Sequence, residues 1–274
     1  MARRICLAEA IVVLLANTSA SSRAAAAETH LRYSVMWGGL HAADFALSMD
    51  DGETTYANTF RFKTRGIADW MPRLKVSVSG NGEAPDVTPP VPRAYRVGYT
   101  NHPRQRVVSL HFDHETGEGT RVVETDRRID GGADPDDGDD QTEVTRDMRT
   151  GGIDPLSAFV ESLRHIRRRL AGGEGEFRLA VFDGRRRFDI EGEYAGTVER
   201  TILNVRRKLH RVRMKTIPIA GFRRRHRILW DGTSFDVFLG TDGLLLPIQI
   251  MTVGPGPVMN LIEECASTCV LPEE

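Results

Sequence analysis

Residues 154–173 read DPLSAFVESLRHIRRRLAGG and predict the one long helix of this chain. Asp154 is suited to the N-cap, Pro155 to the first turn, and the closing Gly-Gly pair to the stop. Apolar residues recur at three-four spacing and form one stripe, which consists of Leu156, Phe159, Val160, Leu163, Ile166 and Leu170. We expect an amphipathic helix over residues 155–171 that packs this stripe against a concave sheet.

The second half of this helix is rich in arginine. Arg164, Arg168 and Arg169 lie off the apolar stripe, so we expect them to project into solvent. Arg167 falls within the stripe and should extend its charge outward past its aliphatic stem. Positive charge in the last turns also stabilises the helix through its dipole.

The helix therefore offers two kinds of candidate ligand-binding residue. The apolar candidates are Leu156, Phe159, Val160 and Leu163, and the cationic candidates are Arg164, Arg168 and Arg169. If the helix leaves part of the sheet interior unfilled, its apolar side chains would line a cavity, although such residues more often form the core alone. The arginines would attract an anionic lipid or polymer.

Short β-favouring runs lie on both sides of the helix. Before it they are Tyr33–Trp37, Phe45–Met49, Thr59–Lys63, Lys75–Ser79, Arg93–Tyr99, Arg106–Phe112 and Gly119–Val123. After it they are Glu176–Phe182, Arg187–Ile190, Thr197–Val205, Lys208–Thr216, Arg227–Trp230, Ser234–Leu239 and Leu246–Val253. Turn residues separate them, among them Asn81-Gly82, Gly184 and Asp242-Gly243. We expect one mainly β domain, an antiparallel curved or spiral sheet or open barrel wrapped about the central helix.

The first residues have the pattern of a secretory signal. Arg3 and Arg4 precede the apolar run Ile5–Ala16, and a mostly small-residue stretch ends at Ala27. This run is too short to span a bilayer, and no later stretch is long and apolar enough to do so. We expect cleavage after residue 27 and a periplasmic chain of residues 28–274, which is not a lipoprotein because Cys6 lies too early.

Charge is unevenly distributed in a chain whose net charge is −1. Residues 113–147 contain thirteen acidic and four basic residues, whereas residues 164–227 contain nineteen basic and seven acidic ones. The two segments either neutralise each other in the fold or form a basic face for an anionic partner. Residues 130–141 form an acidic Gly/Asp-rich loop whose spacing does not match a calcium-binding loop, so we expect no metal site there.

Two cysteines, Cys265 and Cys269, remain after removal of the signal. If Leu261–Cys269 is helical, this spacing brings the two Cα atoms to about 6 Å, within the range of a disulfide. Two free thiols and half of a metal site are the alternatives. Export to an oxidising compartment and the lack of a zinc-like cluster favour a local disulfide.

Candidate catalytic groups are weak. Asp183, Asp189 and Glu191 are the carboxylates that a glycosidase pair would need, but arginines adjoin them and ion pairing is the simpler interpretation. His111, Asp113 and His114 cannot all face one ligand from a single strand. Nucleophile-elbow, phosphate-loop and dinucleotide motifs are absent, as is any nucleic-acid-binding motif. We expect no enzymatic activity, no cofactor, no metal and no nucleic-acid partner.

Four short motifs in order resemble one family. They are Asp154–Ala158, Val181–Arg186, Ile217–Phe222 and Asp242–Pro247, and the opening Tyr33–Trp37 with its two following glycines also fits. The sequence resembles the bacterial exported family of domain of unknown function 3108 over roughly residues 31–260. The resemblance implies a periplasmic protein with a curved or spiral sheet about a helix, similar in outline to lipoprotein carriers, and it transfers no catalytic or ligand residue.

These observations lead to three functional hypotheses. The first is a non-enzymatic periplasmic protein that supports envelope integrity by binding an envelope component or another envelope protein. The second is a carrier of an apolar ligand such as a lipid or lipoprotein. The third is a hydrolase acting on the cell wall, for which Asp183, Asp189 and Glu191 would be the catalytic candidates.

Overall fold

The structure is a computed structural model that describes residues 28–52, 54–65, 73–85, 88–101, 104–113, 119–128, 143–222 and 233–272. The predicted signal, the acidic loop 130–141 and the predicted strand Arg227–Trp230 lie outside the described residues. The strands are β1 (Thr29–Trp37), β2 (Leu40–Asp51), β3 (Thr55–Thr64), β4 (Leu74–Glu83), β5 (Val91–Asn101), β6 (Arg104–Asp113), β7 (Gly119–Arg128), β8 (Glu176–Phe182), β9 (Arg187–Ile202), β10 (Val205–Ala220), β11 (Ser234–Leu239), β12 (Pro247–Thr252) and β13 (Val258–Cys265). The helices are α1 (Arg146–Arg149) and α2 (Pro155–Leu170).

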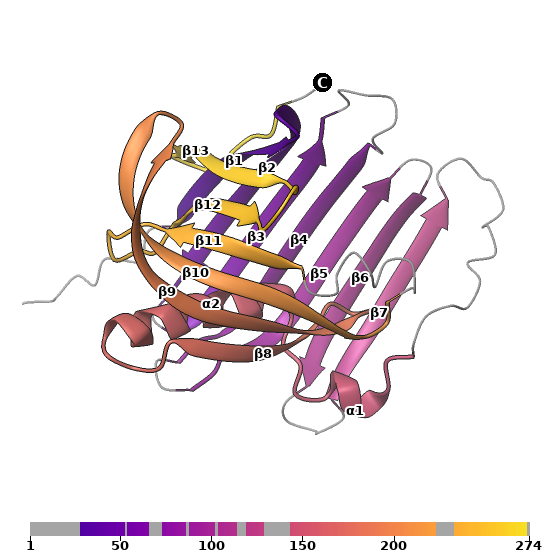
Figure 1. The fold of residues 1–274 in the computed structure, drawn as a ribbon. Coiled ribbons are helices and arrows are strands. Elements are labelled where there is room, and N and C mark those ends of the chain that lie inside the picture. Colours follow the sequence, from indigo (N-terminus) through magenta and orange to yellow (C-terminus); the bar gives the residue numbers. More distant parts are fainter. Residues whose placement is uncertain are drawn as a thin grey trace, which may run out of the picture.

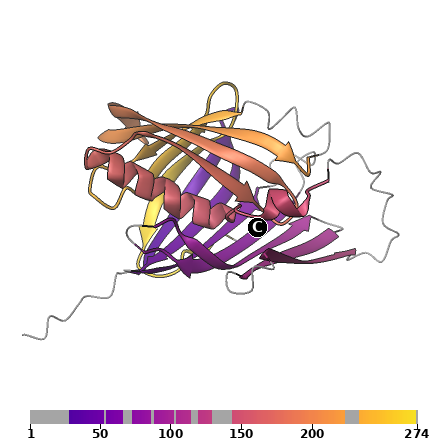
Figure 2. The same cartoon turned by 90° about the horizontal axis from the view of Figure 1, so that it is seen from below.

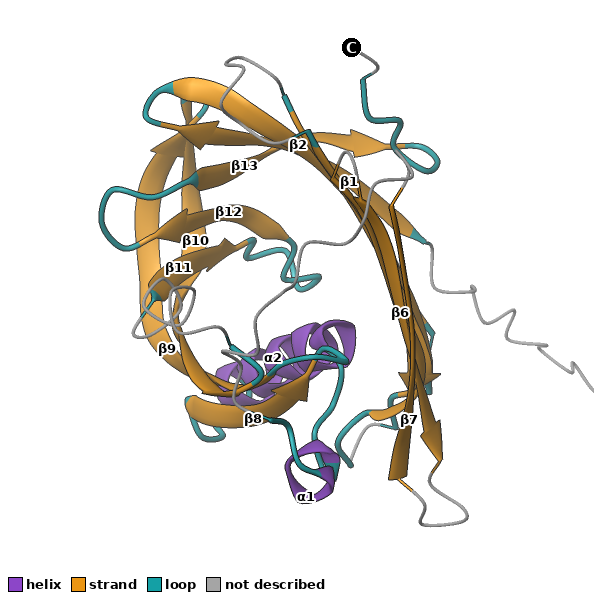
Figure 3. Cartoon of the chain, turned by 90° about the vertical axis from the view of Figure 1, so that its right-hand side faces the viewer, coloured by secondary structure: helices purple, strands orange, loops and turns teal. Residues whose placement is uncertain are grey.

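All thirteen described strands belong to one antiparallel sheet, in the order β7-β6-β5-β4-β3-β2-β1-β13-β12-β11-β10-β9-β8. Two meanders make up this order, because the chain runs outward from β1 to β7 and then returns from β8 to β13, which pairs with β1 (Figure 1). The sheet curls into an open ring, and β7 and β8 are its two edges (Figure 3). The predicted mainly β architecture about a helix is confirmed.

Helix α2 lies inside the ring, between the wall formed by β8 and β9 and the wall formed by β4 and β5 (Figure 2). Its first turn follows the prediction, because Asp154 Oδ1 accepts hydrogen bonds from the backbone N–H groups of Leu156 at 2.9 Å and Ser157 at 3.1 Å. The helix ends one residue before the predicted boundary, and Ala171 is its C-cap.

The predicted single apolar stripe describes only part of α2's burial. Leu156, Val160, Leu163 and Ile166 of the predicted stripe are buried, but Leu170 is 44% exposed. Because sheet walls flank the helix on two sides, four polar residues are buried as well: Ser157, Glu161, Ser162 and Arg164. The expectation that Arg164 projects into solvent is wrong, since Arg164 is only 9% exposed and reaches the carbonyl oxygens of Pro85 and Thr88.

The segment before α2 pairs with one edge of the sheet, and side chains connect the two edges. Ile153 forms a parallel bridge with Val181 of β8, donating its N–H to Ala180 O at 2.9 Å. Across the opening, Glu124 of β7 lies 3.5 Å from Arg185 in the β8–β9 turn and 3.2 Å from Arg106 of β6. Glu124 thus pairs the predicted acidic segment with the predicted basic segment at one point.

Two further expectations need correction. The predicted strands Arg187–Ile190 and Thr197–Val205 lie largely in one hairpin arm, because β9 continues from Arg187 to Ile202 and pairs with β10 throughout. The predicted break at Asn81-Gly82 lies within β4 at a register shift. Gly82 is required there because a β-carbon would collide with Val91 O and with the hydroxyl of Tyr56.

Two glycines with positive φ lie at the β8–β9 turn and next to it, and Gly184 confirms a predicted turn. Gly184 has a φ of 96° in the β8–β9 turn, and Gly221 has a φ of 80° after β10. Both meet close neighbours, since a β-carbon at Gly221 would overlap Arg185 O and one at Gly184 would overlap Val108 of β6. Glycine at position 184 allows the β8–β9 turn to approach β6, and glycine at position 221 allows the chain after β10 to approach the same turn.

Candidate functional site

An apolar cavity of about 190 Å³ lies between α2 and the wall of β8 to β12. The helix contributes Pro155, Phe159, Ser162, Leu163 and Ile166. The sheet contributes Phe177, Ile190, Val212, Met214, Phe235, Val237, Leu239 and Ile250. These strands present alternate residues to the interior, which is why apolar side chains from five neighbouring strands converge on one face of α2.

Ser162 is the one polar side chain among these lining residues. Its hydroxyl donates a 2.7 Å hydrogen bond to the carbonyl oxygen of Ala158, one turn earlier in the helix. A water molecule needs two to four polar partners to be held in a buried site, and this lining provides no such set. The lining therefore favours an apolar occupant.

The predicted apolar candidates separate into two environments. Phe159 and Leu163 line the cavity. Leu156 lies in a different cluster with Val78, Val97 and other residues of β4 to β6, and its side chain lies against Gly80. Val160 is buried, at 6% exposure, but it is not among the residues that line the cavity. The helical spacing placed these four residues on one stripe and did not show that they contact different parts of the sheet.

The arginines of α2 also have different partners. Arg168 donates a 2.6 Å hydrogen bond to buried Glu161, whose carboxylate also lies 3.2 Å from His165. Arg167 is exposed and donates a long hydrogen bond to Leu244 O at 3.4 Å. For Arg169, the described residues include no carboxylate in an ion pair with it. Its guanidinium instead lies 5.9 Å from the ring centre of Tyr194.

Tyr194 belongs to the inner face of β9 and packs against the apolar cluster around the cavity. Its hydroxyl is hydrogen-bonded to His210 Nδ1 at 2.9 Å, and Thr197 lies beside both groups. Burial lowers the pKa of His210, and the positive charge of Lys208 lowers it further. These polar groups lie next to Val212, which pairs with Tyr194 across the sheet and lines the cavity.

A buried polar chain at the start of α2 was not predicted from the sequence. The Tyr56 hydroxyl is hydrogen-bonded to Ser157 Oγ, which donates in turn to Asp154 Oδ2. Burial raises the pKa of Asp154 and of Tyr56. Tyr56 lies about a hundred residues from Asp154 and Ser157, and the sequence indicated only an N-cap role for Asp154. The chain satisfies these buried groups, so it holds the start of the helix against β3.

A second hollow, of about 790 Å³, lies along β8 to β11 and carries charged side chains. Arg178 donates to Asp189 at 2.6 Å and 2.8 Å and to Glu191 at 3.2 Å, and Arg211 forms two hydrogen bonds with Asp236. The charges of Arg178 and Arg211 are thus paired with those of neighbouring carboxylates. Two of the three candidate carboxylates are engaged here, in ion pairs.

The third candidate carboxylate, Asp183, has a different role. Its Oδ1 accepts hydrogen bonds from the backbone N–H groups of Arg185 at 2.9 Å and Arg186 at 2.6 Å, which stabilises the β8–β9 turn.

His111 is exposed on β6, while His114 lies outside the described residues. Within the described ranges, no group of three or more His, Cys, Asp or Glu side chains is arranged to hold a metal ion. None of the helices described there is long and apolar enough to cross a membrane.

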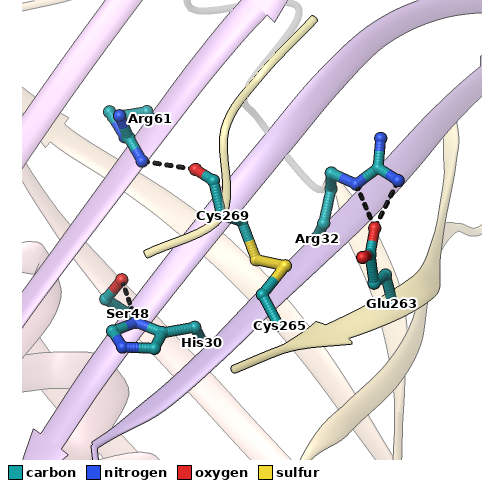
Figure 4. Close-up of a disulfide and its surroundings, with 7 residues drawn as sticks. All are labelled: His30, Arg32, Ser48, Arg61, Glu263, Cys265 and Cys269. Atoms are coloured by element: carbon teal, nitrogen blue, oxygen red, sulfur yellow. Dashed lines mark hydrogen bonds and ion pairs between the residues drawn. A yellow bond between two sulfur atoms is a disulfide. The ribbon is translucent and has the colours of Figure 1, made fainter. Parts of the chain in front are cut away.

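The predicted disulfide between Cys265 and Cys269 is present, with its Cα atoms 5.6 Å apart (Figure 4). The helical premise for Leu261–Cys269 is wrong, because Val258–Cys265 is strand β13, paired with both β1 and β12. The tail beyond the disulfide crosses to β3, where Arg61 donates to Cys269 O at 2.5 Å and Lys63 donates to Pro272 O at 3.0 Å. The disulfide closes the bend that begins this crossing.

The fold and the cavity together define a barrel-like β protein with an internal helix. A family model described as protein of unknown function (DUF3108) matches residues 32–254, and the chain belongs to this family, as its motifs predicted. Among solved structures it is similar to a beta-barrel-like protein of domain of unknown function DUF1849 from Brucella abortus. That match has a TM-score of 0.50 and 11% identity, and covers 88% of this chain and 98% of the other, so the likeness concerns the fold alone. A comparison with curated proteins found no match.

Proposed function

We propose that this protein is an exported, non-enzymatic protein of the bacterial cell envelope that binds the apolar chain of an envelope lipid or lipoprotein. The observation that carries the proposal is the cavity between α2 and β8 to β12, whose lining is apolar apart from one internally bonded serine. The N-terminal signal pattern supports the envelope location.

The size of the cavity limits its occupant. An apolar cavity of about 150 Å³ in another protein stays dry and accepts benzene. A cavity of about 190 Å³ therefore suits a short alkyl segment and is small for a folded multi-chain lipid. We propose that one acyl chain, or the end of one, occupies it.

The hydrolase hypothesis receives less support from the geometry. Asp189 is bonded to Arg178 and Arg187, and Asp183 stabilises a turn, so neither carboxylate is directed at an open reaction site. We therefore place binding ahead of catalysis in this proposal.

Native mass spectrometry of protein isolated from the periplasm tests the proposal. We expect an added mass that corresponds to an amphiphile, released by organic solvent. The variant Ser162→Leu would fill the cavity and abolish the added mass, whereas Ser77→Leu makes the same chemical change at an exposed position of β4 and should retain it. Retention of the ligand by Ser162→Leu, or wild-type protein that binds no alkyl compound, would contradict the proposal.

The envelope role needs a separate test. We expect deletion of the gene to increase sensitivity to detergents and cell-wall antibiotics, and complementation with wild type, but not with Ser162→Leu, to restore resistance. Fractionation with N-terminal sequencing should place the chain in the periplasm with Glu28 as its first residue. Unchanged resistance of the deletion strain under every stress would contradict the proposed envelope role.

A further inference from the structure

We infer that the occupant of the cavity is a single-chain amphiphile with an anionic headgroup, and that Arg169 binds this headgroup at the end of the cavity where α2 terminates. This inference rests on the proposed binding of an alkyl chain, and adds the charge and position of the polar end. Ile166 is the last α2 residue that lines the cavity, and Arg169 follows it by one turn.

The end of the cavity changes from apolar to polar over a short distance. Val212 and Leu239 line the cavity, and their cross-strand partners are Tyr194 and His210 respectively. Tyr194 and His210 are hydrogen-bonded to each other and partly exposed. In the last turn of α2, Leu170 is 44% exposed despite being apolar. An amphiphile matches this arrangement, with its chain inside and its headgroup at the polar rim.

Arg169 differs from Arg168 in having no carboxylate partner among the described residues, and from Arg167 in lying over the ring of Tyr194. Arg168 is bonded to Glu161, and Arg167 donates a long hydrogen bond to Leu244 O at 3.4 Å. Arg169 has no carboxylate within ion-pair distance among the residues that the structure describes. It contacts the Tyr194 ring and donates a long hydrogen bond to Gly173 O at 3.4 Å.

The negative end of the helix dipole does not cancel this positive charge. The last carbonyl oxygens of α2 accept hydrogen bonds from the N–H groups of residues 171–173. The dipole places only about half a negative charge at this terminus, so the full positive charge of the exposed Arg169 guanidinium still attracts an anion. A carboxylate or phosphate would form charge-assisted hydrogen bonds with it, and the Tyr194 ring lies 5.9 Å from it.

Three ligands with the same eight-carbon alkyl chain test this inference by calorimetry: nonanoate, octyl phosphate and 1-octanol. We expect at least one anionic ligand to bind about tenfold more tightly than 1-octanol, and this preference to weaken as salt is raised. Whichever anion binds more tightly identifies the headgroup as carboxylate or phosphate. The variant Arg169→Gln should lose the preference and leave the affinity for 1-octanol unchanged, whereas Arg213→Gln, an exposed arginine of β10, should retain it.

The outcomes separate this inference from the proposed function. Equal affinity for all three ligands would overturn the anionic headgroup but leave chain binding intact. A preference for anions that survives Arg169→Gln would overturn the role of Arg169. Failure of all three ligands to bind would overturn the inference together with the proposed function.

Discussion

The ring of Phe177 in β8 lies where a side chain at Gly192 of β9 would stand. The two residues pair directly across the strands, and a β-carbon on Gly192 would overlap the ring. On its other side, Phe177 is stacked on His165 of α2, with ring centres 5.0 Å apart. Glycine at position 192 therefore allows an aromatic ring to fill the space between the sheet and the helix beside the cavity.

The first prediction concerns this contact. Gly192→Ala should lower the free energy of unfolding by about 1–3 kcal/mol, because the methyl group displaces Phe177 from a packed interior. Gly98→Ala in β5 is the matched control, since a β-carbon there meets only Ser77 O at 3.9 Å. Chemical denaturation measures both variants. Equal stability of the two would show that the ring is free to move aside.

The second prediction separates two arginines that the sequence placed together in solvent. Arg164→Ala should cost about 1–3 kcal/mol of stability, because its guanidinium is buried and bonded to the carbonyl oxygens of Pro85 and Thr88. Arg169→Ala removes an exposed side chain of the same helix and should change stability by less than about 0.5 kcal/mol. Thermal and denaturant unfolding of both variants checks this order, and the reverse order would contradict the position of Arg164.

The third prediction concerns the pH dependence of stability. Burial raises the pKa of Asp154 above its ordinary value of 3.8. Between the unfolded and the folded pKa the native state binds more protons, so this group's contribution to stability decreases as pH rises through that window. Asn is also a good N-cap residue but does not titrate. Asp154→Asn should therefore gain stability relative to wild type as pH is raised from 3.8.

Denaturation of both proteins over a pH series measures this difference. A difference between wild type and Asp154→Asn that is constant with pH would contradict the raised pKa. The variant Asp154→Ala controls for loss of the cap itself, because it removes both the charge and the hydrogen bonds to Leu156 and Ser157. We expect it to lose about 1 kcal/mol at every pH relative to Asp154→Asn.

The fourth prediction concerns the C-terminal disulfide. Replacing both Cys265 and Cys269 by Ser should lower stability by about 2 kcal/mol, the value expected for so short a loop in the chain-entropy model. Reductant should destabilise the wild type by the same amount and leave the double variant unchanged. Hydrogen exchange in β3 near Arg61 and Lys63 should also increase, because the tail contacts both residues. Unaltered stability of the wild type in reductant would show that the strand pairing of β13 alone holds this region.

The sequence predicted those features that depend on neighbouring residues. The N-cap at Asp154, the helix over residues 155–171 to within one residue, and the turn at Gly184 each follow from local chemistry. Prediction failed at β13, where the four-residue spacing of the cysteines was interpreted as helical. Such a spacing is compatible with a helix or with a bend after a strand, and pairing with β1 and β12 decides between them.

By itself, the sequence determined that this chain forms a mainly β fold about one helix, because alternation, turn residues and helix caps act within a few residues of one another. Only the tertiary structure decided what the helix touches. Closure of the sheet brings β4 and β8 to opposite sides of α2, so Leu156 and Leu163 lie in different clusters and Arg164 is buried. Helical periodicity describes one face toward one neighbour, and a helix enclosed by a sheet has neighbours on several sides.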